Sequence, residues 1–492
     1  MKIKNQLPKK AISTSNIYTC SHNSQDGVFK MFLLPNSKFE KVYNRVFTAP
    51  SDKKDYQYYM RMINGLVYES NVYSEIAGKI SSKNVSPNFL SPLLDGEGGE
   101  LDNGWYESPK SFVSLLIEAN VIKVSDPSID TAMKLCQYAL SDTRPTLETK
   151  ALSDFFYQLQ QLSVPPMDFI RDLGISSLSL RSYAREYEID PILKENIELI
   201  CTLADNLKVV GIVTEHINNS TTLETLLKNL RPDIDEDVKE TKNIMFQVVS
   251  GLYLMHIIGL QHNDLHLTNI MIKALPEPVT LNYSLKYTNE EGDYIDKLYQ
   301  LNTIFIVKFF DWDISFMDAS LFQSDQVNAN INPKIVSDFY QRIGVINKIV
   351  PYFDVFTVSC LLVDLYKSNP DIAFTKLKLV DTFFKKATTP AEDATSDRAS
   401  LFSLSSMTDR FGRKTAKRPF AHHDGFVSFD GFQCRPNVKT EKLSEIFATF
   451  PEMITTLGSL ANAEVTQFRG GDISYLLTSE IPNFFDAMTS DF

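Results

Sequence analysis

Three stretches of the chain repeat hydrophobic residues with the spacing of a helix. Apolar side chains recur every three to four positions over residues 241–260, which end in Gly-Leu, and this spacing is typical of an α-helix with a buried face. Residues 66–76 show the same spacing around Glu69. Residues 352–365 are apolar at most positions, which predicts a helix buried on all sides.

Shorter apolar runs between these segments predict β-strands, because they are bordered by polar and turn-forming residues. Residues 283–293 add a further predicted strand and turn. Both strands and helices are therefore expected along the chain. The runs with this pattern are residues 27–32, 87–90, 209–213, 270–272 and 305–310.

Acidic and amide side chains border two of the predicted strands. The polar loop after the helix 241–260 reads H-x-D-x-x-x-x-N from His262 to Asn269, and the last strand ends in Asp311-Trp-Asp. In phosphoryl-transfer enzymes one Asp positions the acceptor hydroxyl, while an Asn and a second Asp hold Mg²⁺ on the ATP phosphates. Asp264 and Asn269 stand at the two ends of one tight loop, so both can face the same γ-phosphate. The pattern predicts a phosphoryl-transfer centre.

On these motifs the chain resembles the protein-kinase-like superfamily, in a divergent form similar to kinases of large DNA viruses and to haspin-type kinases. Asp354, near the start of the helix 352–365, matches the kinase Asp that accepts hydrogen bonds from the catalytic-loop backbone. His266 stands where most protein kinases have Lys, a version shared with haspin-like and small-molecule kinases. The resemblance implies a bilobal α+β fold, with a small mixed β-sheet N-lobe that carries a helical insertion and a mainly helical C-lobe.

The resemblance also implies ATP and Mg²⁺ as cofactors and a role for each motif residue. Asp264 would orient the acceptor hydroxyl and take its proton, and His266 would lie near the transferred group. The implied Mg²⁺ ligands are Asn269 and Asp311, and the implied structural residues are His262 and Asp354.

The expected nucleotide-binding part of the chain carries charged residues that could bind phosphate, but it lacks a glycine-rich loop. Residues 12–18 fall where a glycine-rich loop would be expected, and they contain no glycine. Residues 27–32 resemble the kinase strand that carries the lysine for the α/β-phosphates, and Glu69 would be the ion-pair partner of that lysine. The lysine is expected to be Lys30, with Lys41 and Arg45 as rivals in a similar run.

The hinge that would bind adenine is also recognisable. Residues 209–217 form an apolar strand that ends in a polar tripeptide, followed by a helical pattern over 222–230. By the resemblance, Thr214 would be the gatekeeper, and backbone groups of Glu215 and Ile217 would meet the adenine.

Three stretches exceed a minimal kinase and set the expected domain limits. The first is a long insertion with helical patterns before the hinge strand, and the second is residues 273–303, between the catalytic loop and the strand that ends in Asp311. The third is the C-terminal region, where a Ser/Thr-rich and basic loop follows residue 387 and a helix is expected over 440–457. The predicted parts are an N-lobe, 1–217, with its insertion at about 96–206; a C-lobe, 218–387; a mobile loop, 388–438; and a C-terminal helical part of the C-lobe, 439–492.

Composition and charge narrow the setting. A net charge of −12 argues against a general nucleic-acid binder. The five cysteines are scattered without a C-x-x-C pair, which indicates reduced thiols inside a cell. No apolar run of about 18 residues is present to span a membrane. The resemblance to kinases of large DNA viruses implies a protein substrate and viral structural proteins as partners, in the host cytoplasm or the virion.

Three alternatives stay open on the sequence. Asp-Leu-His with Asp-Trp-Asp also resembles small-molecule phosphotransferases of the aminoglycoside and choline kinase type. Against these, about forty residues separate Asp313 from Asp354, room for an activation segment. The missing glycines suit a catalytically dead, kinase-like structural protein of a virus particle. The period-two spacing of His262, Asp264 and His266 would suit a metallohydrolase if the segment were a strand.

Asn263 bears on regulation. Many protein kinases have Arg at this position between the catalytic-loop His and Asp, and that Arg pairs with a phosphate on the activation segment. A neutral Asn cannot form a bidentate ion pair with phosphate. The sequence therefore predicts activity that does not depend on phosphorylation between Ile314 and Val350.

Overall fold

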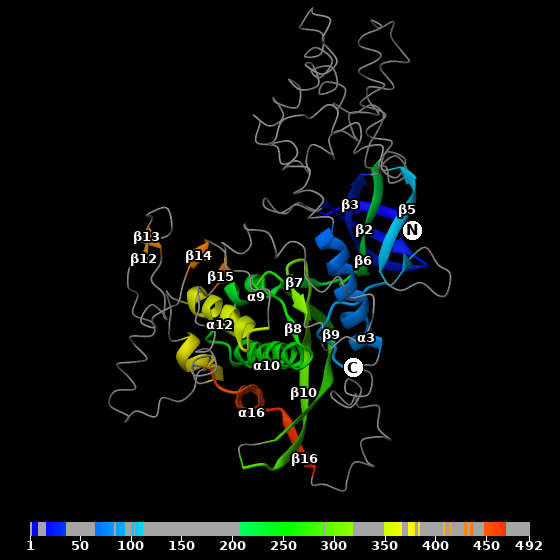
Figure 1. Ribbon diagram of the computed structural model, residues 1–492. Helices are drawn as coiled ribbons and strands as arrows, with labels where there is room; N and C mark the ends of the chain where they lie inside the picture. Colours follow the sequence, from blue (N-terminus) through cyan, green and yellow to red (C-terminus); the bar gives the residue numbers. More distant parts are fainter. Residues whose placement is uncertain are drawn as a thin grey trace, which may run out of the picture. The chain divides into compact units, whose positions relative to one another are not determined.

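The computed structural model shows a mixed α+β protein (Figure 1). The residues that it describes are 2–7, 16–35, 64–82, 85–93, 101–102, 104–111, 207–288, 291–317, 349–366, 372–378, 382–383, 407–408, 414–415, 428–430, 433–435 and 447–468. The chain divides into two compact units. The first comprises Met1–Ser70 and Pro92–His216, and the second comprises Asn71–Ser91 and Ile217–Phe492.

The first unit is built on a six-stranded antiparallel sheet. Its strands lie in the order β1-β2-β3-β6-β5-β4. The turn between β2 and β3 has both central residues, Asn23 and Ser24, at positive φ, the backbone that a two-residue hairpin loop of matching twist requires. The strands are β1 (Lys2–Gln6), β2 (Asn16–His22), β3 (Gln25–Pro35), β4 (Leu101–Asp102), β5 (Trp105–Ser111) and β6 (Leu207–Glu215).

Four of these strands, β1, β2, β4 and β5, were not among the strands predicted from the sequence. β4 and β5 lie inside the range predicted as a helical insertion, at about 96–206, and β5 pairs with the hinge strand β6. The helical patterns over residues 112–206 and the rival cations Lys41 and Arg45 lie outside the described residues.

A helix covers residues 64–82 and crosses the division between the units. Its middle part is a π-helical segment, η1 (Tyr73–Gly78), and it ends in α3 (Lys79–Ser82). Residues 71–91 fall within the predicted N-lobe range, yet they group with the second unit. The reason is local: Phe89 pairs in parallel with Phe309, and the backbones of Asn88 and Leu90 hydrogen-bond Phe309.

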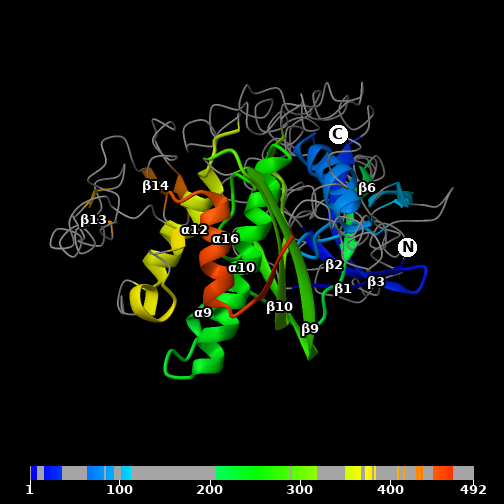
Figure 2. The ribbon, with the colours of Figure 1, turned by 90° about the horizontal axis from the view of Figure 1, so that it is seen from below.

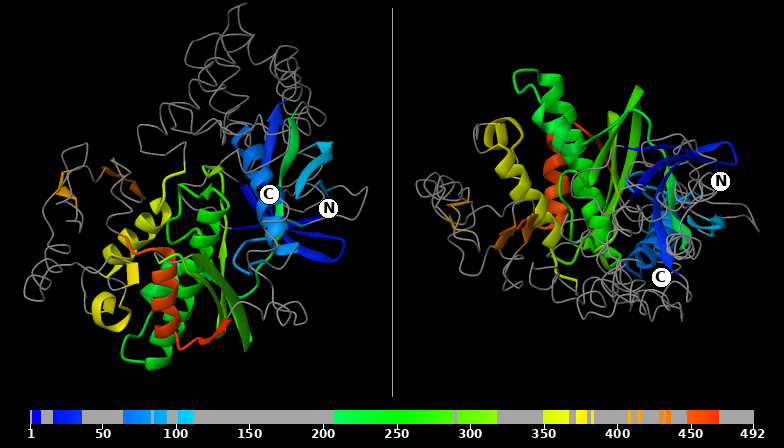
Figure 3. Two further views of the ribbon diagram at one scale, coloured as in Figure 1. Left: turned by 60° about the horizontal axis from the view of Figure 1, so that its bottom comes forward. Right: turned by 90° about the horizontal axis from the view of Figure 1, so that it is seen from above.

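The second unit contains a four-stranded sheet, whose long strands are drawn in green (Figure 3). Its strands lie in the order β16-β10-β9-β7. The sequence predicted short strands at 270–272 and 305–310 and a separate strand and turn over 283–293. All three belong to one long antiparallel hairpin of β9 (Ile270–Thr288) and β10 (Tyr294–Phe309). The ladder shifts register between Thr303 and Phe305, opposite Ala274 and Val279. Two prolines lie in this interruption, where a missing N–H costs no ladder bond. β7 (Ser220–Thr222) and β16 (Glu464–Phe468) complete the sheet.

Helices of the second unit pack around α10 (Asp235–Ile257), which begins six residues before the predicted 241–260. Figure 2 shows α16 (Phe450–Leu460) lying along α10, with α12 (Phe353–Leu365) beside it. The predicted continuous helix 440–457 is wrong, because residues 447–449 are not helical. The helix begins at Phe450, where Thr449 and Glu452 form a capping box.

Short elements complete the described chain. No helix among the described residues is long and apolar enough to cross a membrane. The remaining elements are α9 (Leu223–Lys228), β8 (Leu260–Gln261) paired with β11 (Phe316–Met317), η4 (Ile372–Lys376), and the pairs β12 (Met407–Thr408) with β13 (Lys414–Thr415) and β14 (Ser428–Asp430) with β15 (Gln433–Arg435).

Candidate active site

The loop after α10 is fixed by a buried carboxylate. The backbone N–H groups of His262 and Asn263 donate to the two oxygens of Asp354, at 2.7 and 3.1 Å. Burial raises the pKa of Asp354, against the opposing effects of His262 and the two backbone hydrogen bonds. The contact predicted between Asp354 and the loop backbone is therefore present, and it anchors the loop to the first turn of α12.

Asp264 and Asn269 are joined through the loop backbone. The carbonyl oxygen of Asp264 accepts from the backbone N–H of His266 at 2.8 Å and from Nδ2 of Asn269 at 3.0 Å. Because Nδ2 is engaged in this second bond, the side-chain oxygen of Asn269 is the atom that could bind a cation. Leu265 and Leu267 alternate with the polar residues and are buried. The loop is thus held by its buried apolar side chains, while the side chains of Asp264 and His266 remain partly exposed.

His266 lies beside the expected catalytic carboxylate. Its Nε2 atom is 3.8 Å from Oδ2 of Asp264, and its Nδ1 atom is 2.6 Å from the hydroxyl of Thr268. The Thr268 contact fixes the ring orientation. The sequence identified His266 and not the residue that orients it.

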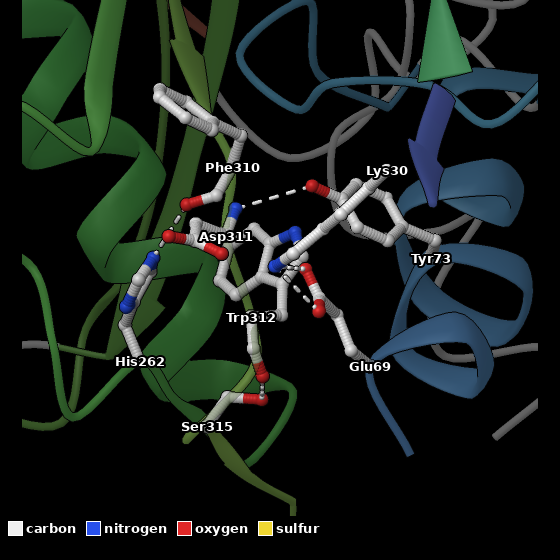
Figure 4. Close-up of polar contacts among 8 residues, drawn as sticks. All are labelled: Lys30, Glu69, Tyr73, His262, Phe310, Asp311, Trp312 and Ser315. Atoms are coloured by element: carbon white, nitrogen blue, oxygen red, sulfur yellow. Dashed lines mark hydrogen bonds and ion pairs between the residues drawn. The ribbon is translucent and has the colours of Figure 1, made fainter. Parts of the chain in front are cut away.

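His262 connects this loop to the end of strand β10. Its Nε2–H group donates to the carbonyl oxygen of Phe310 at 3.0 Å (Figure 4), since a carbonyl can only accept. The ring also packs on Trp312, with centroids 4.6 Å apart. Trp312 is fully buried and stacks on Phe89. The residues before and after Asp311, which are Phe310 and Trp312, are therefore held in position by these contacts.

Asp311 adopts a left-handed backbone conformation, with φ at 69°. This region is unfavourable for a residue with a Cβ atom, by roughly 1–2 kcal/mol, and it persists where surrounding contacts hold it. One such contact is with Tyr73, whose hydroxyl accepts from the backbone N–H of Asp311 at 3.1 Å. The sequence did not point to Tyr73, because nothing in a single sequence relates it to a residue so distant along the chain.

In the first unit, the predicted ion pair between Lys30 and Glu69 is present. The ammonium group of Lys30 is 3.0 and 2.9 Å from the two carboxylate oxygens of Glu69 (Figure 4). The Glu69 side chain is 1% exposed and that of Lys30 is 18% exposed. A buried carboxylate needs such a partner, so the pair holds the lysine in one place. Gly211 allows β6 to pass close to the lysine backbone, because a Cβ atom there would meet the Lys30 carbonyl.

The predicted hinge residues lie at the end of β6 and just beyond it. Thr214 is buried and pairs with Val28 of β3, and Glu215 is the last residue of the strand. Ile217 is buried and belongs to the second unit. The chain thus passes from one unit to the other inside the predicted adenine-binding segment.

The metallohydrolase alternative does not fit the loop. Its period-two argument requires an extended strand, whereas Asn263 has φ at 64° and Nε2 of His262 is bonded to Phe310. No group of three or more His, Cys, Asp or Glu side chains among the described residues could hold a metal ion. Asn269 and Asp311 provide oxygen donors. Mg²⁺ prefers such donors, and it is commonly held by one or two protein ligands together with substrate phosphates.

Comparisons with known proteins give little further guidance. No protein-family model and no curated protein matches the chain. A search of solved structures returns a crystal structure of a Plasmodium kinase domain, with 10% sequence identity and a TM-score of 0.24. The match covers 74% of this chain and 63% of that chain.

Proposed function

We propose that this chain is a bilobal kinase-like enzyme that transfers the γ-phosphoryl group of Mg-ATP to Ser or Thr hydroxyls of proteins. The observation that carries the proposal is the double role of His262. Its backbone binds Asp354 and its ring binds the carbonyl of Phe310. His262 thereby joins the loop with Asp264 and Asn269 to the strand end with Asp311.

Asp264 is the proposed base. The acceptor hydroxyl oxygen attacks the γ-phosphorus, the bond between that phosphorus and the β–γ bridging oxygen breaks, and ADP leaves with the bonding electrons. The hydroxyl proton passes to the carboxylate of Asp264. His266, at 3.8 Å from that carboxylate, carries positive charge beside the transferred group when it is protonated.

Asn269 and Asp311 are the residues that would hold Mg²⁺, which neutralises charge on the β- and γ-phosphate oxygens when bound. Lys30 would bind the α- and β-phosphates, with its position set by Glu69. Thr214 is the proposed gatekeeper, and backbone groups of Glu215 and Ile217 would meet the adenine. Main-chain recognition of this kind depends on where the strand ends more than on which side chains it carries.

A protein acceptor is favoured over a small alcohol by chain length. About forty residues lie between Asp313 and Asp354, enough for a segment on which a peptide can lie. A viral origin, viral structural proteins as partners and a place in the host cytoplasm or the virion are part of the same proposal. They are supported by the motif resemblance to kinases of large DNA viruses.

The test is transfer from γ-labelled ATP by the purified full chain, with proteins and small alcohols offered side by side. Label in Ser or Thr is expected, and label in an alcohol alone would favour the small-molecule alternative. Asp311→Ala should lower the rate at least about 100-fold, since loss of such charge stabilisation costs on the order of 3 kcal/mol. Wild-type turnover by Asp311→Ala at saturating Mg²⁺ would overturn its assignment.

Asp264→Asn is the companion variant. Because Asp264 acts on the acceptor hydroxyl, its loss should lower turnover strongly with little change in ATP affinity. If neither transfer nor ATP binding is detected with the wild-type chain, the dead structural protein becomes the better description.

A further inference from the structure

The peptide group between Phe310 and Asp311 is held at both ends. Its carbonyl oxygen accepts from the ring of His262 at 3.0 Å, and its N–H group donates to the hydroxyl of Tyr73 at 3.1 Å (Figure 4). We propose that Tyr73 is a positioning residue, whose hydroxyl sets the direction in which Asp311 presents its carboxylate to Mg²⁺. This rests on the proposed function, in which Asp311 is a metal ligand.

Asp311 needs such a constraint because of its backbone conformation. Its φ of 69° lies in a region that residues with a side chain rarely occupy without support. If the preceding peptide group rotated, the N–H would leave Tyr73 and the Asp311 side chain would turn with it. The hydrogen bond from His262 restrains only the carbonyl end of this peptide group. The hydrogen bond to Tyr73 restrains its N–H end, and the two bonds together fix the orientation of the peptide plane.

The helix that carries Tyr73 changes from α-helical to π-helical at this residue. Tyr73 is the first residue of the π-helical segment Tyr73–Gly78, and single π-helical turns within α-helices are frequent at functional sites. Val72 and Ile76, on either side of Tyr73, are almost fully buried, and the Tyr73 side chain is buried with them. Packing therefore fixes the ring, and the hydroxyl is delivered to one place.

The variant Tyr73→Phe removes one oxygen and keeps the ring. Two measurements follow its effect on the full chain. The first is hydrogen exchange of the peptide that contains Asp311, without nucleotide, where the variant should exchange faster. The second is Mn²⁺ titration by electron paramagnetic resonance with the non-hydrolysable nucleotide adenylyl imidodiphosphate. Mn²⁺ affinity should fall about tenfold, as is typical when a residue behind a metal ligand is lost, while nucleotide affinity without metal stays unchanged.

Tyr283→Phe is the matched control. The buried Tyr283 hydroxyl donates to Oδ1 of Asn88 at 3.0 Å, so this variant also loses one hydroxyl hydrogen bond in the second unit. It should lower thermal stability and leave Mn²⁺ affinity at the wild-type value. If the role of Tyr73 were only structural, Tyr73→Phe and Tyr283→Phe would have the same effect on Mn²⁺ affinity.

The outcomes separate this role from the proposed function. Wild-type Mn²⁺ affinity in Tyr73→Phe, or an equal loss in Tyr283→Phe, overturns the role of Tyr73 and leaves the proposed function standing. Failure of the wild-type chain to bind Mn²⁺ with the nucleotide overturns the proposed function and this role together. One further measurement uses the wild-type chain alone. Binding of Mn²⁺ with nucleotide should slow hydrogen exchange of the peptide that contains Asp311, and an unchanged exchange rate would contradict Asp311 as a ligand.

Discussion

Gly251 in α10 lies against the strand that leads to Asp311. A Cβ atom at Gly251 would be 2.2 Å from the ring edge of Phe309, whereas ordinary contact begins near 3.4 Å. Gly251→Ala would thus force the ring back by about 1 Å. An alanine in a helix interior is worth up to about 1 kcal/mol more than glycine, and overpacking of a core costs about 1–3 kcal/mol. The expected net change is a loss of about 1–2 kcal/mol in the free energy of unfolding.

The rate of phosphate transfer should fall by more than the loss of stability alone would cause. Phe309 is two residues before Asp311, so we expect a shifted Phe309 ring to displace Asp311, the proposed Mg²⁺ ligand. A misplacement of about 1 Å can cost on the order of 100-fold in rate. Urea unfolding measures the stability, and initial rates of phosphate transfer, taken where the variant is fully folded, measure the activity.

Gly458→Ala provides the control. Its Cβ atom would be 2.6 Å from the ring of Tyr299, which belongs to the same strand β10 but lies ten residues before Phe309. This variant should lose stability while its turnover stays near that of the wild type. In Gly251→Ala, the further change Phe309→Leu should restore part of the stability. Wild-type turnover in Gly251→Ala, or an equal loss in Gly458→Ala, would refute the link from Gly251 to Asp311.

Three further predictions follow from the described contacts. ATP with Mg²⁺ should raise thermal stability by about 2.7 kcal/mol at a hundredfold excess over Kd, and Lys30→Met should reduce this shift, as differential scanning fluorimetry would show; an undiminished shift would argue for another phosphate lysine. Burial lowers the pKa of His256, so its contribution to stability is present above pH 6.5 and is lost as the pH falls through the folded-state value. His256→Phe should keep the stacking on Tyr352 and Phe450 and flatten the decline of unfolding free energy below pH 6.5; parallel pH profiles would contradict this. The neutral side chain of Asn263 donates to the carbonyl of Ile314 at 3.0 Å, and it cannot form a bidentate ion pair with a phosphate. Protein stripped of phosphate should therefore transfer phosphate without a lag, and an initial lag in the first turnovers would contradict this expectation.

The sequence predicted those parts of the site that depend on local pattern. The helix α10 could be identified from its periodicity, and the loop from His262 to Asn269 from the spacing of its polar residues. The anchoring role of Asp354 was implied by the resemblance of its segment to a kinase helix. The ion pair of Lys30 with Glu69 was also expected, because one strand and one helix resemble the kinase segments that carry such a pair.

The remaining features depend on contacts between distant residues. Nothing near Asp311 in sequence shows that its φ is positive or that Tyr73 holds it. The long hairpin was missed because Pro276 and Pro278 normally end a strand, and only the ladder shows that they fall in an interruption. The two sheet strands β4 and β5 carry too little apolar alternation to separate them from the helical patterns that follow.

The pairing of β16 with β10 sets an order for folding during synthesis. Asp296 to Gln300 pair with Glu464 to Phe468, and Phe450 stacks on Tyr253 of α10. The hairpin and α10 therefore leave the ribosome long before the segment that covers them. Until residue 468 has emerged, the nascent chain presents an uncovered strand edge and an apolar helix face, which are the surfaces that chaperones bind and that drive aggregation. Pauses in translation ahead of this segment should lower the yield of folded protein more than pauses after it.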